Sequence, residues 1–78
     1  MPRYFMHLVD GVDVLLDPDG IEIPNGAIVQ KALASARDCI AGDVREGCVD
    51  LRYRIDVHDV NGRVVHSLSF ADAVEILR

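Results

Sequence analysis

The segment LRYRIDVHDVNGRVVHSLSF, Leu51–Phe70, carries the clearest structural signal in this 78-residue chain. Its first half alternates apolar and polar residues with a period of two, which is typical of a strand buried on one face. The apolar members of the alternation are Leu51, Tyr53, Ile55 and Val57. The turn residues DVNG follow, and RVVHSLSF (63–70) returns. The segment therefore predicts an antiparallel hairpin.

The pairing register of this hairpin determines where its two histidines point. A two-residue turn at Asn61-Gly62 pairs Val57 with His66 and gathers the apolar residues of both strands on one face; a four-residue loop keeps those faces. His58 and His66 then lie on opposite faces. A three-residue loop with a glycine bulge shifts the pairing by one and places both rings on one face. We expect opposite faces, because burying four apolar side chains at roughly 1.5–3 kcal/mol each outweighs a turn preference.

The residues before this hairpin predict a second hairpin and a helix. RYFMHLV (3–9) favours a strand, the dipeptide DG (10–11) is a turn signal, and VDVLL (12–16) is the return strand. DPDG (17–20) predicts another turn and IEI (21–23) a brief third strand. Residues 26–45 predict a helix with Asn25 as N-cap. The apolar positions of that helix are Ile28, Val29, Ala32, Leu33, Ala36, Cys39, Ile40 and Val44.

The order of these elements predicts an α+β fold. In the tail FADAVEILR (70–78), helical spacing of Phe70, Val74 and Leu77 predicts a short helix, with Ser69 and Asp72 as a capping box. The order is then strand, strand, short strand, helix, strand, strand, short helix. We expect a single domain, residues 1–78, with an antiparallel sheet of about four strands and one main helix packed across one face.

One helix covers only one face of a sheet, yet the first strand is apolar on both. Tyr4, Met6 and Leu8 lie on one side and Phe5 and Val9, around His7, on the other. The tail or a second copy of the chain would cover that second side. We therefore expect a homodimer.

Composition narrows the compartment and the partners. The net charge is −5, and residues 1–24 contain five acidic residues but only one basic residue. This acidic balance argues against nucleic-acid binding. No apolar run is long enough to span a membrane. The N-terminus reaches Asp10 too soon for the apolar region of a signal peptide, so we expect a cytoplasmic protein.

The residue patterns of catalytic, cofactor and metal sites are not found in the sequence, so we assign none of these sites. The three histidines lack the short paired spacing of zinc ligands, and DPDG has glycine fourth, where a calcium loop has it sixth. No nucleophile turn or glycine-rich phosphate loop occurs. Cys39 is expected as a small buried residue on the helix and Cys48 in a loop, with no disulfide between them.

Three segments together resemble a family of small bacterial proteins of unknown function. They are MPRYFMHL at the start, DPDGIEIPN before the helix and DVNGRVVHSLSFADAVEI at the end. Members of that family open with a PRYFFHL-type strand and end with an LPFADA-type segment. This chain has Met6 where an aromatic residue is usual and Ser69 where proline is usual. The resemblance implies no catalytic residues.

The remaining hypothesis is a homo-oligomerising interaction or regulatory module without catalytic activity, which presents a sheet face or edge to a protein partner. One alternative is a nucleic-acid-binding accessory protein that uses Arg52 and Arg54. A second alternative is a small enzyme or ligand-binding protein with an unidentified site. The candidate interaction surface consists of Arg52, Arg54, His58 and His7.

Overall fold

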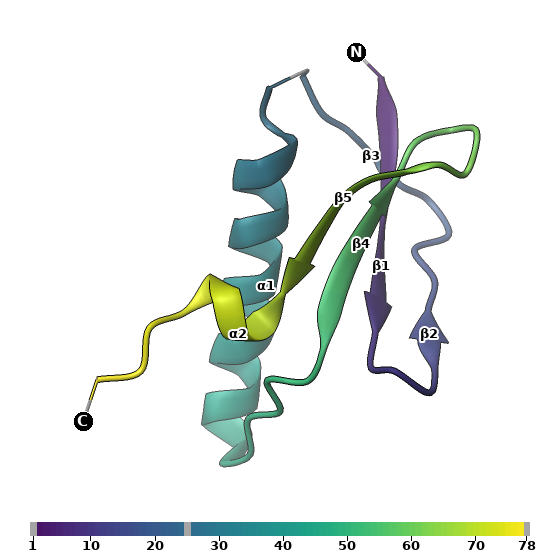
Figure 1. Ribbon diagram of the computed structural model, residues 1–78. Coiled ribbons are helices and arrows are strands. Elements are labelled where there is room, and N and C mark those ends of the chain that lie inside the picture. Colours follow the sequence, from purple (N-terminus) through teal and green to yellow (C-terminus); the bar gives the residue numbers. More distant parts are fainter. Residues whose placement is uncertain (1, 25, 78) are drawn as a thin grey trace.

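The computed structural model describes residues 2–24 and 26–77, and its elements follow the predicted order (Figure 1). The α+β class is confirmed. The described sheet has five strands, one more than expected, because residues 12–23 contribute two short ones. The elements are β1 Arg3–Val9, β2 Val14–Leu15, β3 Ile21–Glu22, α1 Ile28–Glu46, β4 Arg54–His58, β5 Val64–Ser69 and α2 Phe70–Ala73.

β1 lies at the centre of the sheet, and every pairing is antiparallel. The path of the sheet is β2-β1-β4-β5. β4 runs along one edge of β1, with Leu8 opposite Ile55. On the other edge, β3 pairs with the first half of β1 and β2 with the second half. The DPDG turn (17–20) therefore divides one edge of the sheet into two short pieces.

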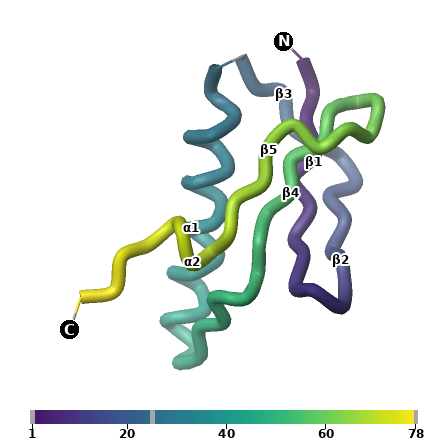
Figure 2. The backbone as a smooth tube through the Cα atoms, in the orientation of Figure 1, coloured from purple at the N-terminus to yellow at the C-terminus, as the bar shows by residue number. Residues whose placement is uncertain are grey.

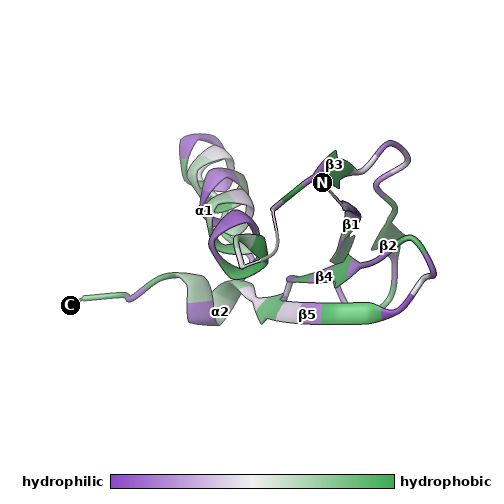
Figure 3. Ribbon diagram, turned by 90° about the horizontal axis from the view of Figure 1, so that it is seen from above, coloured by the Kyte–Doolittle hydropathy of each residue, from purple (hydrophilic) through white to green (hydrophobic). Residues whose placement is uncertain are grey.

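α1 lies along one face of the sheet and packs against β4 and β5 (Figures 1 and 3). Its buried residues Ala32, Ala36 and Ile40 belong to one core with Val57 and Phe70. A helix is about 10 Å wide and strands lie about 4.8 Å apart, so one helix is too narrow to cover four strands. The part of this face formed by β1 and β2 is only partly covered.

The turn between β2 and β3 covers part of the opposite face of β1. At Gly20, a Cβ atom would lie 2.9 Å from the ring of Phe5 and 2.8 Å from the carbonyl oxygen of Tyr4. The segment after α2 points away from the sheet, so the tail does not provide this cover (Figure 2). Contact with the turn removes the need for a second copy over Phe5. The homodimer itself stays a prediction.

Several local predictions about the helices were wrong. α1 begins at Ile28 with Ala27 at the N-cap position, and Asn25 lies outside the described residues. Val29 and Val44, expected in the core, are 56% and 61% exposed, and Cys39 is exposed too. Val29 and Val44 lie in the first and last turns of α1 and remain exposed there, whereas Cys39 lies mid-helix beside the side of the sheet that α1 leaves partly uncovered.

The C-terminal helix is shorter than expected. The Ser69 hydroxyl caps it by accepting from the amide of Ala71 at 3.2 Å, but α2 ends at Ala73. Val74 is extended, with φ −135° and ψ 155°, so Leu77 does not share a helix face with Phe70. Val74 still packs partly against the core, but Ile76 and Leu77 are 64% and 82% exposed, and so short a helix is unstable by itself.

The β4–β5 hairpin places His58 and His66 on opposite faces, as predicted, but it does so by combining a three-residue turn with a bulge, which we did not predict. Its turn is the three-residue type: the Asp59 amide donates to the Arg63 carbonyl at 2.9 Å, and Gly62 has φ +81°. His58 pairs with Val64 but Val57 pairs with His66, which leaves one extra residue in β5. This bulge cancels the one-residue shift. His66 therefore lies on the α1 side and His58 on the opposite face.

Candidate interaction site

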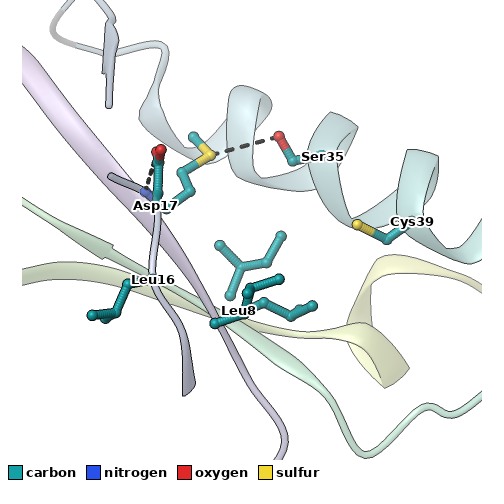
Figure 4. A pocket seen from close by; sticks show the side chains of 8 residues that line it. Leu8, Leu16, Asp17, Ser35 and Cys39 are labelled. Carbon is teal, nitrogen blue, oxygen red and sulfur yellow. Dashed lines mark hydrogen bonds between the residues drawn. The ribbon is translucent and has the colours of Figure 1, made fainter. Parts of the chain in front are cut away.

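An apolar groove lies between α1 and the β1–β2 side of the sheet (Figure 4). Its volume is about 310 Å³. In Figure 4, Ser35 and Cys39 extend from α1, with Leu8 on β1 and Leu16 and Asp17 across the groove. The groove continues toward a second hollow of about 260 Å³ that shares Leu8 and Cys39. The first hollow is lined by Met6, Leu8, Leu15, Leu16, Asp17, Ser35, Cys39 and Ile55; the second adds Asp43, Tyr53 and Phe70.

The outer edge of β2 borders this groove and is not paired with any strand of the described chain. Four large apolar side chains of this segment are exposed: Val12 at 90%, Val14 at 52%, Leu15 at 69% and Leu16 at 65%. An exposed apolar edge strand presents unpaired backbone N–H and C=O groups to any strand that reaches it. We call residues 12–16 together with the groove the β2 surface.

Asp17 fixes the turn beside the β2 surface. Its carboxylate accepts the amides of Met6 at 3.3 Å, Asp19 at 3.3 Å and Gly20 at 3.1 Å. Burial would raise the pKa of Asp17, but these amide hydrogen bonds outweigh it, and the pKa lies below its ordinary value. The amide of Asp17 in turn donates to Nδ1 of His7 at 3.0 Å.

The polar groups that line the groove do not form a reactive centre. Backbone amides already occupy the oxygens of Asp17, and the hydroxyl of Ser35 lies 3.5 Å from the sulfur of Met6. Partial burial of its sulfur, with the nearby charges of Asp43 and Asp38, raises the pKa of the Cys39 thiol. A thiol with a raised pKa is a poor nucleophile. The groove therefore suits apolar contact better than covalent catalysis.

Three of the four residues expected to form an interaction surface share one face of the sheet. His7, His58 and Arg54 lie on the face opposite α1, where the rings of His7 and His58 meet edge to face with centroids 4.6 Å apart. Arg52 precedes β4, in a turn. The strand expected from residue 51 begins at Arg54, so the alternation does not carry Arg52 onto this face.

Both arginines of that expected surface are engaged by aspartates. Arg52 bonds Asp50 through two nitrogens, at 3.0 and 2.9 Å, and this contact lowers the pKa of Asp50 to about 2. Arg54 donates to Asp56 at 3.0 Å, and the same carboxylate accepts from the Ser67 hydroxyl at 2.6 Å. These pairs neutralise the two cations locally, so the arginines do not form a continuous positive surface.

Sequence reasoning missed the β2 surface. The sequence did contain a signal for it. VDVLL (12–16) has apolar residues at both odd and even positions, whereas a strand with one face in solvent needs apolar residues at alternate positions only. The groove itself had no local signal. It arises because α1 packs over β4 and β5, which is decided by contacts distant in the sequence.

The fold and the site define a small α+β protein with an antiparallel sheet, one long helix on one face and an open apolar edge. Residues 3–71 match the family described as Domain of unknown function (DUF6894), and the chain belongs to this family. No curated protein and no solved structure matches it. In residues 2–24 and 26–77, no helix is long and apolar enough to cross a membrane, and no three His, Cys, Asp or Glu side chains are grouped as metal ligands.

Proposed function

We propose that this chain is a non-catalytic interaction module that binds an extended, basic and apolar segment of a partner protein along the β2 surface. The single observation that supports this is the exposed apolar edge from Val12 to Leu16 beside the groove. The partner segment adds a strand to β2, so that its backbone pairs with the free edge. Alternate side chains of that strand enter the groove over Leu8 and Leu15.

The charge around the β2 surface selects the partner. Residues 1–24 contain five acids and one base, Arg3, which is engaged by Glu22 at 3.5 Å and by the carbonyl of Asp19 at 2.7 Å. Asp17 lines one end of the groove and Asp43 lines the adjoining hollow. Lysine or arginine side chains that alternate with apolar side chains along an extended segment complement this arrangement. A second copy of the chain would instead bring acidic residues against acidic residues.

Binding of a defined peptide tests the proposal. The probe is a fluorescent nine-residue peptide that alternates lysine with valine, and its charge-reversed counterpart replaces each lysine with glutamate. We expect the basic peptide to bind, with an affinity that falls as salt rises, and the acidic peptide not to bind. In NMR titrations, the amides of residues 12–16 should shift and those of β5, the other edge, should not.

A matched pair of variants localises the site. Leu15→Arg places a cation on the exposed edge and should weaken binding at least about tenfold. Val60→Arg makes the same change at an exposed residue in the β4–β5 turn and should leave binding unchanged. Three results would overturn the proposal. The first is that both peptides bind equally well, and the second is that neither binds at millimolar concentration. The third result is an edge already occupied by a second copy of the chain or by its own tail.

The nucleic-acid alternative receives no support from the arrangement of Arg52 and Arg54, since Asp50 and Asp56 engage them. The enzyme alternative would need a reactive group in the groove, and Cys39 has a raised pKa. The contact chemistry of the β2 surface is that of strand addition.

A further inference from the structure

We propose that His7 is a proton-sensitive latch that holds the edge of the β2 surface in place. The neutral ring ties the turn between β2 and β3 to β1, and protonation of its Nδ1 atom releases that turn. The consequence for binding rests on the proposed function, whereas the latch itself can be measured on the free protein.

The geometry requires a neutral ring. Nδ1 of His7 accepts a hydrogen bond from the amide of Asp17 at 3.0 Å. A nitrogen can accept only when it carries no proton, so in this state the ring proton is on Nε2. When Nδ1 takes a proton, two N–H donors face each other and the bond is lost. Imidazole is the side chain that makes this change near neutral pH.

The released segment is held in few other places. The Asp17 carboxylate bonds the amide of Met6, Arg3 donates to the carbonyl of Asp19, and Gly20 lies against Phe5. β2 itself is only two residues long, Val14 and Leu15, and ends two residues before Asp17. Apart from the pairing of these two residues with Val9 and Leu8, the His7 bond is one of the few contacts that hold this end of the edge against β1.

Charged groups on the neighbouring elements face His7 with opposite effects. The Asp17 carboxylate in the turn and Asp56, directly opposite on β4, favour a protonated ring. Arg54 is paired with Asp56 and lessens its effect. His58, also on β4, lies 4.6 Å away between ring centroids and opposes a second positive charge. With a proton on Nδ1 the ring can no longer accept the Asp17 amide, and loss of that bond is the release that we propose.

A loosened edge should bind a partner strand less well. A strand that must be ordered on binding loses conformational entropy that an already extended strand does not. Backbone amides hold the pKa values of Asp10 and Asp17 below the ordinary value near 3.8, so these two carboxylates still attract a basic peptide at about pH 5.5. We therefore expect weaker peptide binding at about pH 5.5 than at about pH 7.5.

Amide hydrogen exchange of the free protein, corrected for intrinsic rates, tests the latch. We expect the protection of the Asp17 and Gly20 amides to fall about tenfold between about pH 7.5 and about pH 5.5. His7→Asn supplies an oxygen that accepts the same bond but does not titrate, so its protection should not change with pH. His58→Asn, on the same sheet face, keeps the titratable latch and should still show the fall.

Two results would overturn the latch: unchanged protection in the unmodified protein, or the same fall in His7→Asn. Neither measurement includes a peptide. The proposed function is judged separately, by peptide binding at about pH 7.5. A failed latch therefore leaves the docking proposal standing, and a peptide that does not bind leaves the latch standing.

Discussion

At the scale of single residues, Gly20 is the position where a side chain would do most damage to the divided edge. Its φ of +71° lies in the left-handed region, and a Cβ atom there would lie 2.8 Å from the carbonyl oxygen of Tyr4. Backbone strain and a clash with main-chain atoms both act at this residue. Gly62 has a similar φ of +81° but has open space where its Cβ atom would be.

These two glycines make a matched pair of variants. We expect Gly20→Ala to lower the free energy of unfolding by about 3 kcal/mol and Gly62→Ala by about 1 kcal/mol, because only the first adds a clash to the strain. Urea denaturation followed by circular dichroism measures both. Equal losses for the two variants would show that the contact of Gly20 with β1 is not tight.

His66 is a second residue with a measurable consequence. Its Nε2 atom is buried and has no hydrogen-bond partner within the described chain. A buried polar atom without a partner costs stability. We expect His66→Leu to raise the free energy of unfolding by about 1 kcal/mol in urea denaturation. His58→Leu, on the opposite face, removes no such atom and should give no gain. A loss of stability in His66→Leu would contradict this account.

At the scale of elements, the turn between β2 and β3 depends on the ionised carboxylate of Asp17. The amide bonds hold its pKa below the ordinary value, so the folded state binds the proton less readily than the unfolded state. The resulting stability is present above the ordinary pKa near 3.8 and is lost as pH falls through the lowered value.

Asp17→Asn tests this dependence. An amide side chain must point a donor at one of the backbone amides, so we expect a loss of about 1–3 kcal/mol in free energy of unfolding at about pH 7. The difference from the unmodified protein should narrow below about pH 4. The contributions of the other carboxylates are the same in both proteins, so they cancel in the difference between the two free energies of unfolding. A difference that stays constant with pH would mean that the charge of Asp17 is unimportant.

The β4–β5 hairpin shows how an element can satisfy two preferences at once. The turn at Gly62 takes the three-residue form, and the bulge in β5 restores the register that buries Ile55 and Val57. Burial of apolar side chains on one face is worth more than a regular ladder, so the irregularity falls in the outer strand, where it disrupts no further neighbour.

At the scale of the whole molecule, the β2 surface exists because one helix is narrower than the sheet that it packs against. Because α1 packs over β4 and β5, the apolar side of β1 and β2 remains partly open to solvent. The reason for expecting a homodimer was an uncovered second face of β1, and the turn that lies against Phe5 covers part of that face.

The homodimer stays a prediction that light scattering tests directly. A monomer has a mass of 8.6 kDa, and we expect twice that mass at micromolar concentration. The acidic residues around β2 oppose self-association there, so Leu15→Arg should leave the dimer intact while it weakens peptide binding. A monomer throughout the micromolar range would contradict the homodimer, and a dimer broken by Leu15→Arg would place it at the β2 surface.

The sequence alone determined the class and order of the elements and the faces of the principal strands. These follow from local periodicity: alternation in residues 51–58, helical spacing from residue 28, and turn residues at DPDG and DVNG. The family resemblance also rested on sequence. Element lengths were less well predicted, because the ends of α1 and α2 depend on whether a surface lies opposite them.

Only the tertiary structure decided the candidate site. Which strands α1 covers, and that Asp17 lies against His7 ten residues away, depend on packing between segments distant in the chain. Arg52 shows a different limit: strand alternation placed it on the polar face, but it lies in a turn before β4, where it bonds Asp50 two residues away. Periodicity reports the environment of each element along its own axis. It carries no information about how wide a neighbouring element is or which edge remains free.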